Sequence, residues 1–349
     1  MSTFKRFLQY YKPYKGIFFM DLFCALIMCV VDLSFPLILS YCTGKFFLKS
    51  SNEILKGVLF LGIGLLIMYV IRALCRYYVS CQGHVMGANM ESDMRQDLFN
   101  QYQRLSFSYY DKHNTGVMMS RVVSDLFDIC EFAHHGPENL FISLFKIVGS
   151  FIILATIYWP LALILLAVTI VMMAFSYSQN KKMRRTFMEN RKKIGSVNAS
   201  LQDSLGGIRV VQSFANEDIE IDKFNHSNME FLESKKDNYR VMGTFQGGNN
   251  FFQGLLYVTI IVFGGLFIAN GDLNPIVLAT FALYINVFVS PIEVLVEFTE
   301  MFQKGFSGFR RFEEVMNEIP EIQDSKNAKD LKNVSGNIDF DHVSFQYNE

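Results

Sequence analysis

Six apolar stretches of this chain are each long enough to cross a lipid bilayer as a helix. A helix needs about 20 mostly apolar residues to span the hydrocarbon core. The chain is 51% hydrophobic and only 19% charged, so one soluble core cannot cover its apolar side chains. The sequence therefore predicts an all-α membrane fold with six long transmembrane helices, at residues 17–39, 54–74, 140–158, 161–177, 251–269 and 276–294.

Basic residues predict how these spans are oriented. Of the 32 Lys and Arg, we place Lys45, Lys49 and Lys56 on the opposite side of the membrane from the rest, and Lys146 inside a span. The others are assigned to the N-terminal segment, the two long connections and the C-terminal tail. Because basic residues are enriched in cytoplasmic segments, we expect both termini and both long connections in the cytoplasm. The net charge of −1 offers no electrostatic reason to expect nucleic acid as a partner.

The two long connections read as helices rather than loops. Residues 179–203 contain almost no Gly or Pro and are rich in Lys, Arg, Met and Asn. At 1.5 Å per residue they extend the fourth span by about 37 Å beyond the membrane. Residues 86–105 and 217–242 have the same character. The sequence predicts a cytoplasmic stalk of paired helices, which suits a machine driven from the cytoplasmic side.

Three motifs lie in these connections and in the tail. They are ESDMRQDLF at 91–99 with LSFSYYD at 105–111, Gly116 and SRVVSD at 120–125; SLGGIRVVQSFANE at 204–217, ending at Phe224; and GFRRFEEVMNEIPE at 308–321 with GNIDFDHVSFQY at 336–347. Together and in this order on six spans, these motifs resemble the exporter-type ATP-binding-cassette transporters, in particular the bacterial multidrug-type half-transporters, over nearly the whole chain. The resemblance implies a cell membrane location, expected to be the bacterial plasma membrane.

The resemblance assigns roles to particular residues. It implies a short coupling helix around residues 107–114 and a second coupling corner at residues 204–214, both directed at a nucleotide-binding domain. It also implies that the aromatic ring of Tyr347 stacks on adenine. Glycines suit the second corner because they permit a sharp turn and a close approach of another domain. The expected coupling residues are Tyr109, Tyr110, Asp111, Gly206, Gly207 and Arg209.

The same resemblance divides the chain into four parts. We expect an N-terminal cytoplasmic segment (1–16), a six-helix transmembrane domain with intracellular coupling loops (17–312), a linker (313–335) and the β start of a truncated nucleotide-binding domain (336–349). The chain contains no G-x-x-x-x-G-K-[ST] phosphate loop. We therefore expect no catalytic residue, cofactor or ATP hydrolysis in this chain, whereas the full-length protein would use ATP and magnesium.

Two charged residues inside the predicted spans are candidates for a substrate pathway, because intramembrane charges are costly. Asp32 lies about 10 Å from the outer end of its span and Lys146 about 20 Å inward from Trp159, counted at 1.5 Å per residue. These different depths argue against a direct pair. Packing against polar helix groups is the alternative for Asp32, and snorkelling to the interface is the alternative for Lys146.

A polar stripe on the sixth span supplies the other candidates. Its members recur at spacings of three and four residues, which places them on one helical face. In the resembled family this helix lines the translocation path, although a seam between subunits is the alternative. Acid-rich walls would suit a cationic amphiphile. We take the first four as pathway candidates: the stripe is Asn286, Ser290, Glu293, Glu297, Glu300 and Lys304.

We expect no metal site in this chain. The pair His134 and His135 is the nearest approach to one, but adjacent residues point to different faces of a helix. The six cysteines show no metal-ligand spacing and read as small apolar residues.

The sequence thus predicts the transmembrane domain of an exporter for amphipathic small molecules, working by alternating access. The implied partners are a second half-transporter subunit, nucleotide-binding domains, the bilayer and a hydrophobic or amphipathic substrate. A flippase for lipids or lipid-linked molecules is the alternative within the family. A six-helix channel or membrane sensor is the alternative from another class, but no pore loop or Arg-rich voltage helix is evident.

Overall fold

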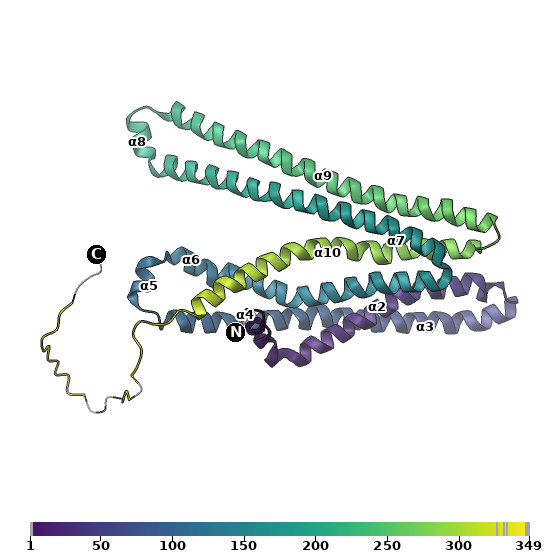
Figure 1. The fold of residues 1–349 in the computed structure, drawn as a ribbon, viewed down its shortest axis with the longest axis horizontal. Helices are drawn as coiled ribbons and strands as arrows, with labels where there is room; N and C mark the ends of the chain where they lie inside the picture. The colour runs from purple at the N-terminus through teal and green to yellow at the C-terminus, as the bar shows by residue number, and fades with distance from the viewer. Residues whose placement is uncertain (1–2, 326, 331, 333, 346–349) are drawn as a thin grey trace.

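The computed structural model describes residues 3–325, 327–330, 332 and 334–345, and it is all-α in these parts of the chain. Long helices run side by side, and short helices connect them at one end (Figure 1). In chain order the elements are α1 (Thr3–Phe7), η1 (Leu8–Tyr14), α2 (Lys15–Gly44), η2 (Phe46–Leu48), α3 (Ser51–Tyr78), η3 (Val79–Gly83), α4 (His84–Tyr102), α5 (Phe107–Lys112), α6 (Thr115–Ser120), η4 (Arg121–Asp125), α7 (Leu126–Gly206), α8 (Ile208–Ser213), α9 (Glu217–Ala269) and α10 (Pro275–Met316).

Five helical segments of the described chain are long and apolar enough to cross a membrane. The six predicted spans fit into five because α7 contains both the third and the fourth. Its backbone leaves the helical conformation at Tyr158 (φ −157°, ψ 95°), two residues before Pro160. Proline cannot donate a helical hydrogen bond and disfavours helical geometry in the residue before it, so the chain can reverse here. Figure 1 shows α7 running out and then back.

The short connections at the end opposite α5 and α8 (Figure 1) are explained by local sequence signals. Ser50 and Glu53 form a capping box at the start of α3, which satisfies backbone N–H groups that have no helical partner. Asn274 accepts a hydrogen bond from the N–H of Ile276 and caps α10, whose first residue is Pro275. Gly271 adopts a positive φ of 81° in the turn between α9 and α10. The cap at Asn274 and the positive φ of Gly271 explain the tight turn between α9 and α10.

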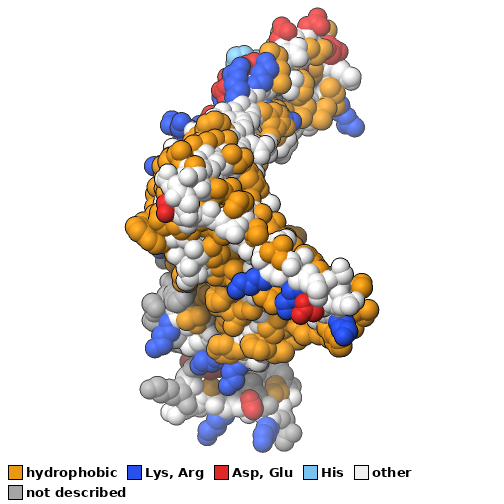
Figure 2. Space-filling model, turned by 90° about the vertical axis from the view of Figure 1, so that its right-hand side faces the viewer, with side chains coloured by type: hydrophobic (Ala, Val, Ile, Leu, Met, Phe, Trp, Pro, Cys, Tyr) orange, Lys and Arg blue, Asp and Glu red, His pale blue; other side chains and the backbone are white. Residues whose placement is uncertain are grey.

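The membrane half packs around α10. Its rings Phe281, Tyr284 and Phe288 are fully buried against both limbs of α7 and against α9. By contrast, no residue in the most apolar window of α3 is buried within the chain. Figure 2 views the molecule from the right-hand side of Figure 1, where α9 turns into α10, and shows many hydrophobic side chains on this face. Lipid or another subunit must therefore cover α3.

A second core lies near the N-terminus, toward the end of the molecule that carries α5. Met86, Met90, Met94 and Leu98 recur every four residues on α4 and are fully buried. They pack with η1, the start of α7 and the last turns of α10. This core joins the lower bundle of Figure 1, whereas the returning limb of α7 pairs with α9 as a long hairpin tipped by α8, whose membrane half packs on α10.

The β start expected after Gly336 is not formed in the described part of the tail. Residues 334–345 contain no strand. A strand needs a neighbouring strand to pair its backbone N–H and C=O groups, and the described chain supplies none here.

The arrangement gives a topology prediction. A cysteine introduced at Lys192 or Lys236, both exposed on the α7–α9 hairpin, should react with a membrane-impermeant maleimide only from the cytoplasmic side. A cysteine at Asp272, in the exposed α9–α10 turn, should react only from outside. The chain without an added cysteine is the control, because five of its own cysteines are buried and Cys81 is half-buried. Labelling at Lys192 from outside intact cells would overturn the orientation.

Candidate functional site

Three charged side chains from three helices meet within the membrane half. The Asp32 carboxylate on α2 lies 2.6 Å from Lys146 Nζ on α7. It also accepts a hydrogen bond of 2.8 Å from Arg72 Nε on α3. The side chains of Asp32 and Lys146 are only 19% and 20% exposed, so the network is largely shielded.

The sequence-based expectation that Asp32 and Lys146 do not pair was therefore wrong. The depth estimate treated both helices as upright, whereas α2 is inclined to its neighbours in Figure 1. The long Lys146 side chain also reaches several ångströms from its backbone. Arg72 was missed because it was grouped with the cytoplasmic connection. Its position two residues before the end of the predicted span 54–74 was the signal that it belongs to the membrane half.

A cavity of about 280 Å³ lies beside this network. It brings together four of the six pathway candidates, Asp32, Lys146, Asn286 and Ser290, from α2, α7 and α10. Apolar and aromatic side chains form the rest of the wall, a mixture typical of small-molecule sites. The lining residues are Asp32, Phe35, Pro36, Tyr69, Lys146, Leu283, Asn286, Val287, Ser290 and Pro291.

Two prolines increase the polarity of the cavity wall. Pro36 has no N–H to donate to the carbonyl of Asp32, four residues earlier in α2. Pro291 stands in the same relation to Val287 in α10. The wall therefore includes two carbonyl groups that lack their usual intrahelical donor.

Hydrogen bonds from α9 and α10 fix the wall around the cavity. Asn286 Oδ1 accepts hydrogen bonds from Gln253 Nε2 (3.2 Å) and from the Tyr257 hydroxyl (3.4 Å), both on α9. The buried Tyr284 hydroxyl donates to the carbonyl of Leu33, next to Asp32, over 2.5 Å. Sequence periodicity placed Asn286 on the polar face of α10, but nothing in it indicated these partners.

The remaining acidic candidates lie farther along α10. Glu293 and Glu297 are exposed, as are all six members of the stripe, but neither lines the membrane cavity. Glu300 forms an ion pair with Lys304 over 2.7 Å. The stripe thus shares one solvent-accessible face, as its spacing predicted, and it extends away from the cavity toward the C-terminal end of α10.

That end of the stripe borders a larger cavity of about 670 Å³ between α7 and α10. Basic side chains outnumber acidic ones in its wall, so the acid-rich character expected from α10 alone does not hold here. Burial raises the pKa of Asp128 above its ordinary value. The lining residues are Asp128, Lys181, Arg184, Arg185, Phe187, Met188, Arg191, Glu300, Gln303, Lys304, Ser307 and Arg311.

The first coupling candidates lie on α5. Tyr109 is buried and stacks on the His113 ring at 4.0 Å, whereas Tyr110 and Asp111 are exposed. The Ser108 hydroxyl donates to Glu321 over 2.6 Å, which lowers the pKa of that carboxyl. This bond ties α5 to the segment that follows α10.

The second coupling candidates surround α8. Gly206 ends α7, and Gly207 turns the chain between the two helices. A Cβ atom on Gly207 would lie 3.1 Å from the carbonyl of Asp203, whereas one on Gly206 would meet open space. No residue of α8 is buried, and Arg209 points into solvent. In Figure 1, α5 and α8 lie at the same end of the molecule. Tyr347 lies outside the described residues.

The ion network gives a stability prediction. Replacing Asp32 with Asn should lower the Tm of the purified chain in detergent, because Arg72 and Lys146 lose their shared carboxylate. Removing one partner of a buried pair costs about 3–5 kcal/mol, and the partial exposure of both cations places the loss at the lower end. Lys146→Met should cost less, since Asp32 keeps Arg72. Asp272→Asn, at an exposed turn, is the control; equal Tm values for it and Asp32→Asn would contradict the prediction.

Comparison with known proteins identifies the family to which this architecture belongs. Residues 18–292 match the family described as the ABC transporter transmembrane region. An uncharacterised ABC transporter ATP-binding protein of Bacillus subtilis (strain 168), YwjA, is 37% identical over 99% of this chain and 60% of the relative. An ATP-dependent lipid A-core flippase of Syntrophus aciditrophicus (strain SB) is 24% identical over 100% of this chain and 58% of the relative.

A putative multidrug export ATP-binding/permease protein of Bacillus subtilis (strain 168), YgaD, is 26% identical over 99% of this chain and 60% of the relative. The chain thus spans about three fifths of the length of these relatives. The family match covers all but residues 1–17 and 293–349, so it ends within α10. The chain is a multi-pass membrane protein and belongs to the family of ABC exporter transmembrane regions.

Proposed function

We propose that this chain forms the translocation pathway of an exporter for amphipathic molecules, which works by alternating access. The observation that carries the proposal is a direct helical connection between the membrane cavity and the other end of the molecule. A polar cavity lies between membrane helices, and two of these helices run unbroken from it into the cytoplasmic half. From Ser290 to Met316, α10 covers about 39 Å at 1.5 Å per residue. Such helices transmit a displacement at one end to the other.

The energy would come from nucleotide-binding domains in the full-length protein, using ATP and magnesium. The exposed faces of α5 and α8 lie at one end of the molecule, where such domains could press on both. Phe107 on α5 is 88% exposed and Phe214, after α8, is 72% exposed. Large exposed rings at two corners support a docking role, because isolated soluble surfaces rarely keep them uncovered.

A second copy of the chain, or a related half-transporter, is the proposed partner within the membrane. The uncovered apolar window of α3 supports this. The membrane cavity of one chain is also small for an amphipathic molecule, since ligand pockets usually measure about 300–1,000 Å³. Two such walls facing each other would enclose a larger pathway.

Flipping of an anionic lipid is the second candidate function, and a specific observation favours it. One carboxylate faces two cations in the membrane network, which leaves an excess positive charge beside the cavity. The cytoplasmic cavity is basic as well. Both features suit an acidic headgroup entering from the cytoplasmic side. The relative named as a lipid A-core flippase is in keeping with such a substrate.

Coupling and substrate contact should be separable by mutation in the full-length protein. Gly207→Val should impair substrate-stimulated ATPase while leaving substrate binding near normal, because its Cβ would crowd the Asp203 carbonyl at the α8 corner. Gly195→Val is the matched control, since Gly195 lies on α7 outside the corner and its Cβ would meet open space. Asn286→Leu and Glu293→Gln should instead change substrate affinity or range and preserve basal ATPase.

The assignment of these two regions fails under either of two results. One is loss of ligand binding in folded Gly207→Val protein. The other is unaltered transport of every tested substrate in both α10 variants.

The two candidate substrates can be told apart by charge reversal. Arg184→Glu should reduce stimulation of ATPase by an anionic lipid at least several-fold and leave stimulation by a cationic amphiphile unchanged or raised, since Arg184 lines the basic cavity. Lys182→Glu is the matched control, because Lys182 is exposed on the same helix but does not line the cavity. Equal effects of the two substitutions on the lipid response would remove the case for a flippase.

A further inference from the structure

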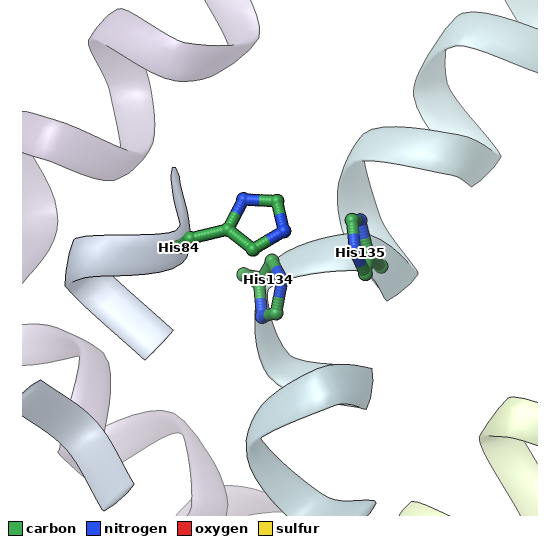
Figure 3. Close-up of side chains that lie close together, drawn as sticks. All are labelled: His84, His134 and His135. Carbon is green, nitrogen blue, oxygen red and sulfur yellow. The ribbon is translucent and has the colours of Figure 1, made fainter. Parts of the chain in front are cut away.

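Three histidines gather where α4 begins beside the first limb of α7 (Figure 3). His84 is the first residue of α4, and His134 and His135 lie on α7. Their ring centroids are 4.6 Å apart for His84 and His134, 5.0 Å for His84 and His135, and 4.0 Å for the adjacent pair. One ring nitrogen from each lies within 4.8 Å of the other two. The sequence predicts that His134 and His135 point to different faces of the helix, but their rings lie side by side.

The buried ring of His134 has the hydrogen bonding of a metal ligand. Its Nδ1 lies 2.7 Å from the carbonyl of Cys130. A carbonyl only accepts, so Nδ1 carries the hydrogen and the neutral ring keeps a lone pair on Nε2. Nε2 is buried and has no hydrogen-bond partner among the described residues, although His134 is only 6% exposed. Metal-ligating histidines commonly donate their other N–H to a backbone carbonyl in this way.

Local backbone features bring α4 this close to α7. The π-helical turn η3 ends at Gly83, immediately before His84, and such turns are frequent at functional sites. Gly87 lies one turn later on α4. A Cβ atom there would be 2.8 Å from His134 Nδ1, so glycine leaves the space that the ring occupies.

Carboxylates surround the three rings. Glu138 Oε2 lies 3.7 Å from His135 Nδ1, and Glu131 Oε2 lies 3.9 Å from His135 Nε2. Asp21 on α2 is 4% exposed, and its Oδ1 has no hydrogen-bond partner among the described residues. That oxygen lies 3.2 Å from where a Cβ on Gly83 would stand, next to His84. Asp21 Oδ1 and His134 Nε2 are thus two buried electron-pair donors without a hydrogen-bond partner among the described residues, and a bound cation would satisfy both.

We propose that His84, His134 and His135 form a binding site for a first-row transition-metal dication such as Zn²⁺. Imidazole nitrogens suit these ions, and the nearby carboxylates would offset the charge of the ion. Zn–N bonds measure about 2.0–2.1 Å, so the rings must draw together slightly. The exposed His84 side chain is free to make that movement. The ion would clamp α4 to α7 near the cytoplasmic ends of the second and third spans.

The experiment measures Zn²⁺ binding by the purified chain in detergent, carrying an affinity tag without histidine. Competition with a chromophoric chelator should show one saturable Zn²⁺ per chain, and Zn²⁺ should raise the Tm. His84→Gln and His135→Gln should each weaken binding at least tenfold and abolish the Tm rise. His226→Gln is the matched control, since this exposed α9 histidine also has a glutamate neighbour, Glu230. Co²⁺ should give the visible absorption of a nitrogen-rich, low-coordination site in the parent protein only.

His84→Gln keeps the test decisive even where a substitution of the buried His134 prevents folding, because His84 is exposed. The proposal is overturned if the parent chain binds no Zn²⁺ saturably, or if His84→Gln and His135→Gln bind it as tightly as the parent. It is also overturned if His226→Gln loses binding to the same extent, since that result indicates non-specific surface binding. None of these readouts depends on transport, so the outcome is independent of the proposed function.

Discussion

Inside a bilayer every backbone N–H and C=O group must be paired within the chain, and a single segment satisfies this only as a helix. This constraint explains why the described chain is helical and why its elements are so long. It also explains where the helices depart from regularity. The break at Tyr158 lies at the end of a span, and Pro36 and Pro291 leave carbonyls uncompensated beside a polar cavity rather than toward lipid. The irregular backbone is confined to places where polar surroundings satisfy it.

The same low polarity makes the few buried charges decisive for packing. Asp32 can remain ionised in this environment because Arg72 and Lys146 approach it from two other helices. This network holds α2, α3 and the first limb of α7 around one carboxylate, and Tyr284 attaches α10 to the same region through the Leu33 carbonyl. The surplus cation makes the wall of the cavity beside it positive.

Hydropathy and motif order predicted the spans and the two corners, because these depend on one helix or one turn at a time. The contacts between helices could not be predicted in this way. The Asp32–Lys146 pair depends on the inclination of α2, and the basic wall depends on which part of α7 faces α10. Arg72 was misplaced because it was counted with the cytoplasmic connection, although it lies inside the predicted span 54–74. The histidine cluster needs a π-helical turn and Gly87, neither of which has a helical periodicity to reveal it.

The distribution of contacts divides the chain into two mechanical units. The lower bundle is held by the Met-rich core of α4, the bidentate pair of Arg311 with Asp125, and the membrane network. The hairpin of the returning α7 limb and α9 packs on the apolar rings of α10 in its membrane half, whereas its far half is held by polar bonds such as Lys193–Glu230. That far half can tilt without opening the apolar core around α10, and tilting there would widen or close the basic cavity between α7 and α10. The proposed metal clamp joins α4 to the first limb of α7, so it would brace the bundle and leave the far half of the hairpin as the moving part.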